Sequence, residues 1–446
     1  MEIKSGTNQS RCFRILEKTQ WLNRDQIELL QYNSLKAILR HTYANVPFYR
    51  QRFKETGIKP EDIKSINQLV KFPKLTKADI RSNFHRMIST STPVHKLVPN
   101  ATGGSTGEPL KFAKDKRTIS WANAAVVRNY SWAGLEAGDK YVSLWGSPFD
   151  ISLSRKLSGF LKNLFERHRM LPSSEMSERS MAQYAKIIRS FKPKAIKGYA
   201  SALAFFARYL ERQGICDLNL HSVISTAEKL FSQDREIIQK QFNCEVYDTY
   251  GSREFAIMAG ECREHIGYHV SSETVLLEFV KDNEHVSPGD LGEILVTDLQ
   301  NYGMPLIRYA IGDAGIPCEG TCSCGRGLPL IGSISGRVTD FIRAHNGKYI
   351  SGPGLTLIFS DLSVRRYQIV QRSLDRFFVR IVREPDYSDK DDKAIVSRMK
   401  EVVGEDAEII IQHFSSIPKS PRSGKYRFII SEVPLFDSDK RVMTFV

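Results

Sequence analysis

The sequence predicts an α/β protein with a large first domain and a small, mobile α+β second domain. Three observations support this prediction. The chain has 446 residues, more than one ordinary hydrophobic core holds. Helical and strand-like runs alternate between residues 116 and 251. After residue 340, a shorter stretch mixes strands with one helix. We therefore place the domain boundary at Thr339–Asp340, which gives domains over 1–338 and 339–446.

Apolar spacing and turn residues predict the elements in order. Residues 20–56 show the spacing of helices. The alternating region then predicts helices over 116–133, 176–191, 201–214 and 232–242, with strands over 140–146, 194–199, 222–227 and 245–251. Between about 270 and 345 the pattern becomes strand-rich, with Gly and Asp turns. In the second domain we expect strands over 366–371, 376–382 and 407–414 and a helix over 390–403. The large domain should thus hold mixed sheets flanked by helices.

Composition narrows the classes of function. No run of about 20 apolar residues exists to span a bilayer, and the first 26 residues lack the apolar segment of a signal peptide. Seven cysteines, an odd number, argue against a disulfide framework, so we expect a reducing cytoplasm. The net charge of +14 is spread along the chain without a nucleic-acid-binding motif. We therefore expect no nucleic-acid partner, and the oligomeric state stays open.

One segment combines basic and apolar residues at helical spacing. Over 151–169, six apolar residues recur every three or four positions, with four basic residues between them. Such a stripe is most often the core face of a surface helix. The same pattern also suits peripheral contact with a membrane surface, and this alternative stays open.

A loop rich in glycine and hydroxyl groups offers a phosphate site. The stretch 101–109, "ATGGSTGEP", lets backbone N–H groups and hydroxyls wrap a phosphate. It lacks the Lys-Ser/Thr of a Walker loop and the pattern of a dinucleotide-binding Rossmann loop. By itself the loop is weak evidence, because such residues often mark plain turns.

Four further motifs follow in order, and together the five resemble the adenylate-forming superfamily of acyl-CoA synthetases, peptide-synthetase adenylation domains and luciferases. They are "YGSRE" at 250–254, "IRYAIGD" at 307–313, "GRVTDF" at 336–341 and "SGKYRF" at 423–428. Within it the chain looks like the phenylacetate-CoA ligase and CapK (capsule biosynthesis) group. That closer likeness is carried by "HTYANVPFYRQRF", "FPKLTKADIR", "GSREFAIMAGEC" and "CSCGRGLPLIGSISGR".

The resemblance implies a nucleotide site for ATP and AMP. The phosphate loop would hold the β- and γ-phosphates with Thr102, Gly103, Gly104, Ser105, Thr106 and Gly107. Glu254 would carry Mg²⁺, and Asp313 would bind the ribose hydroxyls. Tyr250 would stack on adenine, and Gly251, Ser252 and Arg253 would line the same turn.

Two basic residues complete the implied catalytic set. Arg337 would lie near the ribose and phosphate at the interdomain hinge. Lys425 would reach in from the small domain and contact the carboxylate and the α-phosphate. Two positions depart from the superfamily pattern: Arg253 stands where a Thr touches the adenylate phosphate, and Thr339 stands where many members carry an acidic hinge residue. These departures leave the details of the second half-reaction open.

Cysteine and histidine residues form a second constellation. Cys262 and His269 are followed some 50 residues later by Cys322 and Cys324, and thiolates with imidazole are the ligands that zinc prefers. Cys318 is an alternative to one of them. Four protein ligands leave no open position for a catalytic water, so we expect a structural zinc in a subdomain over about 262–335. The phenylacetate-ligase-like pattern favours the same interpretation.

These features predict an ATP-dependent ligase that activates a carboxylic acid as acyl-AMP, releases pyrophosphate and passes the acyl group to CoA, an amine or a sugar. The acid pocket should lie near 145–150 and 198–205. Two alternatives stay open: an adenylyltransferase that acts on a cofactor or phosphate without CoA, and a non-catalytic nucleotide-binding scaffold of a polysaccharide pathway. The sequence does not name the acid, the acceptor or the pathway.

Overall fold

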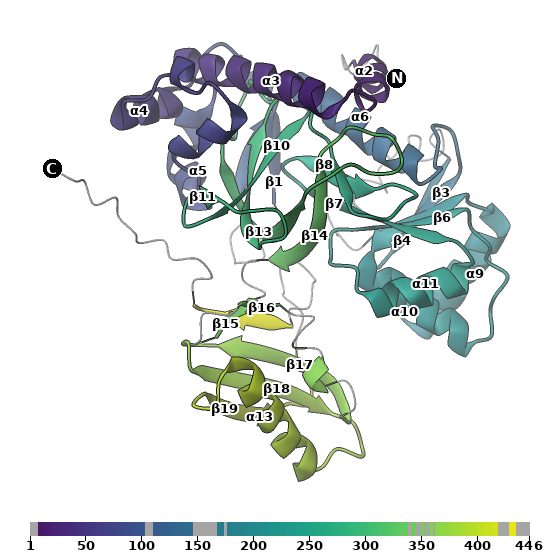
Figure 1. The fold of residues 1–446 in the computed structure, drawn as a ribbon. Coiled ribbons are helices and arrows are strands. Elements are labelled where there is room, and N and C mark those ends of the chain that lie inside the picture. The colour runs from purple at the N-terminus through teal and green to yellow at the C-terminus, as the bar shows by residue number, and fades with distance from the viewer. Residues whose placement is uncertain are drawn as a thin grey trace.

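The fold is that of a large sheet domain with a small sheet domain below it in the view of Figure 1. The computed structural model describes residues 8–102, 110–145, 167–173, 176–337, 341–344, 349–351, 355, 357–359, 362–417 and 428–433. Its α-helices are α2 (Gln9–Thr19), α3 (Arg24–Asn45), α4 (Pro47–Thr56), α5 (Lys77–Asn83), α6 (Lys116–Trp132), α9 (Glu178–Phe191), α10 (Ala200–Arg212), α11 (Ser232–Phe242) and α13 (Asp389–Val403).

Local sequence signals begin and end these helices. Asn23 caps α3 by accepting from the Gln26 amide at 2.9 Å, while the Gln26 side chain accepts from the Asn23 amide. Asp115 caps α6 through the Thr118 amide at 2.7 Å. Gly57 ends α4 in the left-handed conformation, where glycine has no Cβ to clash. Short 3₁₀ turns join the N-terminal helices: Pro60–Asp62, Ile66–Lys71, Phe84–Met87 and Val94–Lys96, with another at Leu357–Phe359.

One twelve-stranded sheet runs through the large domain in the order β11-β10-β12-β13-β14-β9-β8-β7-β6-β5-β3-β4. Its parallel half consists of β3 (Tyr141–Trp145), β4 (His168–Pro172), β5 (Ala195–Tyr199), β6 (Ser222–Thr226) and β7 (Glu245–Ser252). Helices α9, α10 and α11 cover one face of this half (Figure 1), and their apolar side chains form one core with the strands. This pattern of strands and covering helices is the alternation that the sequence predicts.

The other half of the sheet is antiparallel. It contains β8 (Ala256–Glu261), β9 (Tyr268–Val270), β10 (Val275–Lys281), β11 (Glu284–His285), β12 (Gly292–Asp298), β13 (Tyr309–Cys318) and β14 (Leu330–Arg337). The largest hydrophobic core joins these strands to α3, α4 and α5. A hairpin of β1 (Val98–Ala101) and β2 (Lys111–Lys114) stands beside it. The antiparallel half is thus tied to the N-terminal helices.

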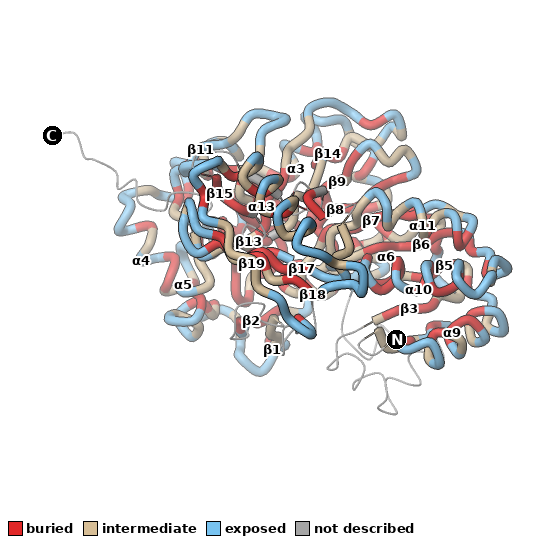
Figure 2. The backbone as a smooth tube through the Cα atoms, turned by 90° about the horizontal axis from the view of Figure 1, so that it is seen from below, coloured by how far each residue is buried: buried red, intermediate tan, exposed pale blue. Residues whose placement is uncertain are grey.

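The small domain has its own sheet and core. Strands β17 (Val364–Gln371), β18 (Arg376–Arg383), β19 (Glu408–His413) and β20 (Ile429–Ser431) form it, and β15 (Phe341–Arg343) pairs with β16 (Tyr349–Ser351). Helix α13 packs on the sheet through Ile395, Met399 and Val403. Buried segments lie inside both domains, with exposed segments around them (Figure 2). The predicted boundary at Thr339–Asp340 lies outside the described residues.

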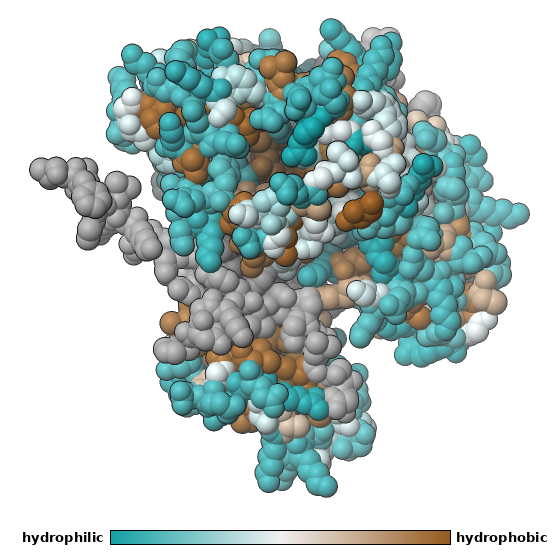
Figure 3. Space-filling model, viewed as in Figure 1, coloured by the Kyte–Doolittle hydropathy of each residue, from teal (hydrophilic) through white to brown (hydrophobic). Residues whose placement is uncertain are grey.

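The helical stripe predicted over 151–169 is wrong at its end. His168 and Arg169 begin strand β4, which pairs in parallel with β3. The hydrogen bonds that these two residues gain by pairing with β3 stabilise the strand more than the local sequence favours a helix. The remainder of the stripe, up to residue 166, lies outside the described residues. No helix in the described part of the chain is long and apolar enough to cross a bilayer, and the face in Figure 3 is mostly hydrophilic.

Candidate functional site

Two hydrogen bonds between Thr102 and Leu110 join the ends of the phosphate loop, at the point where the loop connects β1 to β2. The Thr102 amide donates to the Leu110 carbonyl at 3.0 Å, and the Leu110 amide donates to the Thr102 hydroxyl at 3.0 Å. These two bonds fix where the loop starts and ends. Of the predicted phosphate-binding residues, Thr102 lies at this point. Gly103, Gly104, Ser105, Thr106 and Gly107 lie outside the described residues.

The turn between β7 and β8 carries the predicted magnesium carboxylate. Glu254 is 6% exposed, and its carboxylate accepts a hydrogen bond at 3.1 Å from the hydroxyl of Tyr309 on β13. Gly251 is required here, because a Cβ at this position would lie 2.2 Å from the Ala256 carbonyl oxygen. The close approach of the two strands therefore sets the shape of the turn, and Tyr309 orients the carboxylate that it presents.

Tyr250 and Asp313 meet beside this turn. The Tyr250 hydroxyl donates to the Asp313 carboxylate at 2.9 Å, and both side chains are 8% exposed. Asp313 also pairs across the strands with Arg337, the last residue of β14. Because neighbouring strands lie about 5 Å apart, the Arg337 backbone is next to the predicted ribose-binding residue. The Arg337 side chain and the whole of Lys425 lie outside the described residues.

A buried lysine that the sequence analysis did not single out supports the same turn. The Lys114 ammonium donates to the Arg253 carbonyl at 3.0 Å, and the side chain is 8% exposed. Burial lowers the pKa of Lys114, while the nearby carboxylates of Asp298 and Glu254 oppose that change. Lys114 thus places a cation beneath Glu254 and fixes the backbone at Arg253. Its only signal in the sequence is its position soon after the phosphate loop.

Asp298 faces this lysine from the end of β12. Its Oδ1 accepts from the Gln300 and Asn301 amides at 2.8 and 3.1 Å. Burial raises the pKa of Asp298 to about 6, against those backbone hydrogen bonds and the Lys114 charge. The carboxylate is therefore ionised at neutral pH, and the charges of Asp298 and Lys114 stabilise each other in the interior.

A buried ion pair fixes the backbone next to Tyr309. Arg308, fully buried and with a positive φ of 51°, binds both carboxylate oxygens of Glu278 at 3.0 and 3.1 Å. It also donates to the carbonyls of Val70 and Phe72. A left-handed conformation is unusual for a residue with a Cβ, so these bonds hold strained backbone in place. Arg308 thereby connects the N-terminal segment to the tyrosine that orients Glu254.

The four predicted metal ligands also come together. The ligand atoms of Cys262, His269, Cys322 and Cys324 all lie within 4.8 Å of one another. The Cys262 and Cys322 sulfurs are 3.7 Å apart, and the Cys324 sulfur is 3.3 Å from His269 Nε2. Tetrahedral zinc with bonds of about 2.3 Å to sulfur places two sulfurs about 3.8 Å apart. The geometry and the donor atoms therefore fit zinc, and Cys318 lies outside the cluster.

The electrostatics of this cluster suit a ligand set. Burial lowers the pKa of His269 to about 4, so the imidazole is neutral at pH 7 as a metal requires. Burial opposes ionisation of Cys324, yet hydrogen bonds with the Arg326 backbone and side chain leave its pKa lowered overall. Burial raises the pKa of Cys262 to about 12 and also raises that of Cys322. A cation bound between them would reverse this effect.

The loop after Cys324 packs on the N-terminal helices. The Gly327 amide donates to the Gln20 carbonyl at 3.1 Å, and a Cβ on Gly327 would lie 1.8 Å from the Leu22 carbonyl oxygen. The Arg326 guanidinium lies over the rings of Trp21 and Trp132, at 4.9 and 5.0 Å from their centroids. The loop that carries Cys322 and Cys324 therefore fastens the α2–α3 turn to the antiparallel half of the sheet.

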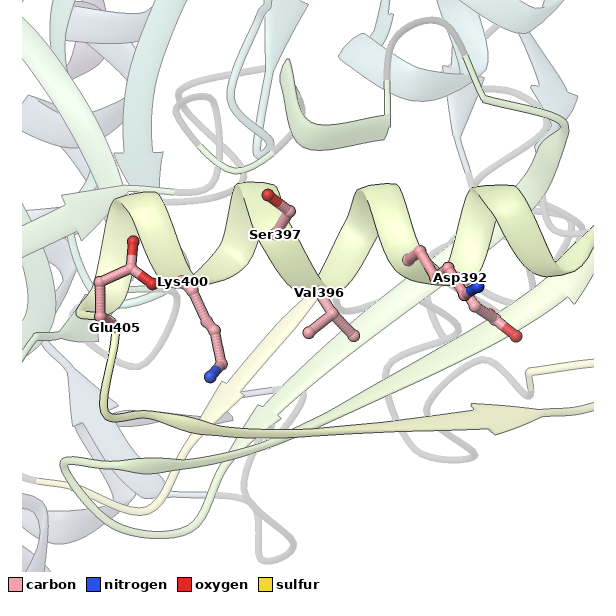
Figure 4. Close-up of a pocket in the computed structure, with 6 residues that line it drawn as sticks. Asp392, Val396, Ser397, Lys400 and Glu405 are labelled. Atoms are coloured by element: carbon pink, nitrogen blue, oxygen red, sulfur yellow. The ribbon is translucent and has the colours of Figure 1, made fainter.

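A shallow hollow lies elsewhere, on the small domain. Its lining comes from the exposed side of α13 and the turn that follows: Asp392, Lys393, Val396, Ser397, Lys400 and Glu405 (Figure 4). The lining is charged and open to solvent, and none of the predicted site residues belongs to it. We therefore keep the candidate site at the β7–β8 turn.

Comparison with known proteins identifies sequences that are similar to this chain. The model of the CapK C-terminal domain matches residues 342–432. The chain is 29% identical to the phenylacetate-coenzyme A ligase of Pseudomonas putida over 337 residues, 74% of each protein. It is 26% identical to the protein CapK of Staphylococcus aureus over 420 residues, 91% of this chain and 89% of CapK.

Solved structures show the same fold. A crystal structure of 2-hydroxyisobutyryl-CoA ligase, in the postadenylation state with an acyl-AMP, superposes with a TM-score of 0.73. It is 19% identical to this chain, and the match covers 94% of this chain and 92% of the ligase. In sequence the chain is thus similar to phenylacetate-CoA ligases and to CapK, and in fold it is similar to an AMP-forming CoA ligase.

Proposed function

We propose that this protein is an AMP-forming ligase that activates a carboxylic acid as acyl-AMP and transfers the acyl group to CoA. The observation that carries the proposal is the meeting of Glu254, Tyr250 and Asp313 at the β7–β8 turn, where Tyr250 donates to Asp313 and Tyr309 donates to Glu254. The relatives are phenylacetate-CoA ligases, and the superposed structure holds an acyl-AMP.

In the first half-reaction, each of the predicted site residues would bind a different part of the substrates. A carboxylate oxygen of the acid attacks the α-phosphorus of ATP, and pyrophosphate leaves. Thr102 and the following loop would hold the β- and γ-phosphates, Asp313 the ribose, and Tyr250 the adenine ring. Glu254 would hold Mg²⁺, which neutralises phosphate charge when bound. Lys425 would align the acid and the α-phosphate, so that the reaction proceeds from a fixed geometry.

In the second half-reaction the CoA thiolate attacks the acyl carbon, and AMP leaves. The small domain would rotate about the segment after Arg337, which moves Lys425 away and brings an acceptor-binding face to the acyl-AMP. The CapK-type C-terminal domain and the 91% coverage by CapK favour a second version of this step. In that version the acceptor is an amine or sugar in surface-polysaccharide synthesis. Either version makes the small domain the determinant of the acceptor.

We also propose that Cys262, His269, Cys322 and Cys324 hold a structural zinc. The near-tetrahedral spacing of the ligand atoms and the neutral imidazole support it. Metal analysis of the purified protein should find about one zinc per chain, and Cys322→Ser should lower that content. An equal content in Cys216→Ser, an exposed cysteine outside the cluster, is the control.

A pyrophosphate-release assay tests the main proposal. ATP and Mg²⁺ are supplied with a panel of aryl, short-chain and sugar-linked acids, with and without CoA, beside Lys425→Ala. Acid-dependent release that is lost in Lys425→Ala establishes adenylation, and dependence on CoA identifies the acceptor. ATP binding without release for any acid contradicts the proposal and leaves the adenylyltransferase or the scaffold.

A further inference from the structure

The residues that precede two members of the Cys/His cluster both bind strand β7. Glu261 precedes Cys262, and its carboxylate accepts from the Asp248 backbone amide at 2.8 Å. Tyr268 precedes His269, and its hydroxyl donates to the Asp248 carboxylate at 2.8 Å. Asp248 is therefore connected to the cluster twice, once through its backbone and once through its side chain.

These contacts run across three neighbouring strands in the interior of the sheet. Glu261 of β8 pairs with Tyr268 of β9, and the residue after Asp248, Thr249, pairs with Gly260 of β8. Asp248 and Glu261 are both buried. A hydrogen bond is stronger in a buried site than in water, and losing one partner leaves a buried polar group unsatisfied. The three side chains are therefore tightly linked.

The Glu261 carboxylate is also held from a helix. Arg235 of α11 donates to its two oxygens at 2.7 and 2.9 Å, and Nδ1 of His265 lies 3.2 Å from Oε2. Arg235 donates to the carbonyl of Val246 on β7 as well. The oxygen that accepts from the Asp248 amide is thus fixed, and β7 is bound to this group at two points.

The same strand leads directly to the nucleotide residues. Tyr250 follows Asp248 by two positions, so both side chains lie on the same face of the sheet. Tyr250 pairs with Ala259, and the register of the two strands shifts between Tyr250 and Gly251. Tyr250 is therefore the last residue of the regular pairing, and the pairs before it set its position. Its hydroxyl donates to Asp313 at 2.9 Å.

We propose that Asp248 is a positioning residue that connects the Cys/His cluster to the nucleotide site, so that occupancy of the cluster by zinc strengthens ATP binding. This inference rests on the proposed ligase function and on the proposed zinc. Cys262 and His269 are held in place when the cluster is loaded, and Glu261 and Tyr268 pass that restraint to Asp248. Strand β7 keeps its pairing with β6, so the effect is one of position and not of unfolding. By thermodynamic linkage, ATP strengthens zinc binding by the same factor.

Reciprocal binding measurements test the proposal. Retention of zinc by the full chain against a chromogenic chelator is measured with and without a non-hydrolysable ATP analogue and Mg²⁺. We expect the analogue to raise the zinc affinity of the wild type at least about fivefold, the lower end of typical coupling between sites. Calorimetric titration of the analogue into zinc-loaded and zinc-depleted protein should give the same factor. A wild-type factor below about twofold overturns the proposal.

Three variants locate the connection. Tyr268→Phe keeps the ring but removes the hydrogen bond to Asp248, so it should lower the coupling factor below about twofold and raise the KM for ATP about fivefold with little change in kcat. Asp248→Asn retains an oxygen that accepts from Tyr268 and should keep the coupling. Tyr32→Phe is the matched control, because it removes a hydroxyl that donates to the Ile63 carbonyl at 3.2 Å, in the N-terminal helices. It should keep the wild-type factor, and a wild-type factor in Tyr268→Phe overturns the proposal.

The binding measurements separate this inference from the ligase function, because they require neither an acid nor a reaction. Coupling in the wild type that is lost in Tyr268→Phe supports the connection even where no acid is adenylated. In that case the ligase function fails and the role of Asp248 stands. Acid-dependent pyrophosphate release without coupling overturns the connection and leaves the ligase function. A chain that binds no zinc, or no ATP analogue, overturns the connection as well.

Discussion

The two halves of the twelve-stranded sheet use charge in opposite ways. In the parallel half, ion pairs lie on the outside: Arg189 and Asp217 bind each other with side chains 48% and 55% exposed. The antiparallel half has exposed pairs as well, but it also holds two inside: Arg308 and Glu278 are 0% and 1% exposed, and Arg128 and Glu273 are 0% and 2% exposed. The parallel half is thus held by apolar packing, and the antiparallel half by apolar packing together with buried polar networks.

This difference matches the work proposed for each half. The strand ends of the parallel half, at Trp145 and Tyr199, lie where the sequence predicts the acid pocket. The antiparallel half holds the Cys/His cluster and also Tyr309 and Asp313, whose geometry the proposed reaction would use. Glu254 lies in the turn that joins the halves. We infer that substrate choice belongs to the parallel half and the fixed catalytic framework to the antiparallel half.

The largest expected effect lies at the junction of the halves. Glu254→Gln should lower the rate of acyl-AMP formation about a thousandfold, because a metal ion supplies several kcal/mol of charge stabilisation and each 1.36 kcal/mol is tenfold. Pyrophosphate release measures it. Glu245→Gln, an exposed position at the start of β7, should keep the wild-type rate. Comparable activity in Glu254→Gln would remove this residue from the catalytic set.

Breaking a buried pair should distinguish the two halves in stability. Arg308→Met should lower the free energy of unfolding by about 3–5 kcal/mol, because Glu278 is left as a buried charge without its partner. Urea unfolding measures it. Arg189→Met, which breaks an exposed pair in the parallel half, should leave the urea midpoint unchanged. Arg308→Met combined with Glu278→Met should recover part of the loss, and equal effects of the two single variants would refute the contrast.

A pH dependence should follow from Asp298. Its pKa is raised from 3.8 to about 6, so the folded state binds more protons than the unfolded chain between about pH 4 and 6. The free energy of unfolding should therefore fall as pH rises through this window, by at most about 3 kcal/mol. Above about pH 6 the full cost of burying the charge is present.

Asp298→Asn tests that contribution, because its side-chain oxygen still accepts from the Gln300 and Asn301 amides. Urea midpoints between pH 4 and 7 should fall less steeply than those of the wild type. Asp217→Asn is the exposed control: Arg189 lowers the pKa of Asp217, so its small contribution has the opposite sign and is lost as pH falls. An unchanged slope in Asp298→Asn would show that Asp298 does not titrate in this range.

The smallest expected effect comes from metal removal. A chelator should lower Tm by about 3 °C, which corresponds to about 2 kcal/mol for a domain of this size. Hydrogen exchange should accelerate in β9, in the loop over 322–327 and in α2, which that loop contacts. The parallel half should exchange as before. Acceleration across both halves would mean that the cluster stabilises the whole domain.

The sequence predicts the parallel half of the sheet well. Strands β3, β5, β6 and β7 and their helices lie where the alternation places them, because each element there follows its own periodicity and packs on its neighbours in the chain. The α/β fold class and the phenylacetate-CoA ligase and CapK relationship are confirmed as well. Motifs with fixed order also located Tyr250, Glu254 and Asp313, whose assigned roles stay predictions.

The rest depends on partners distant in the sequence. Strand β4 is a five-residue edge strand at the end of an amphipathic run, so its pairing with β3 decides its conformation. Lys114 and Arg308 look like ordinary surface cations in the sequence. Their burial depends on Asp298 and Glu278, which only the folded sheet brings near. No local pattern carries that information.

The contacts of Gly327 limit the order in which parts of the chain can fold during synthesis. The residues that hold the α2–α3 turn in place are synthesised some 300 residues after the turn itself. A chain emerging from the ribosome can complete the parallel half once residue 252 has appeared, while α2 must wait without its final contacts. Helix α2 can pack on α6 once residue 132 has appeared, but the turn after it gains its final contacts only near the end of synthesis.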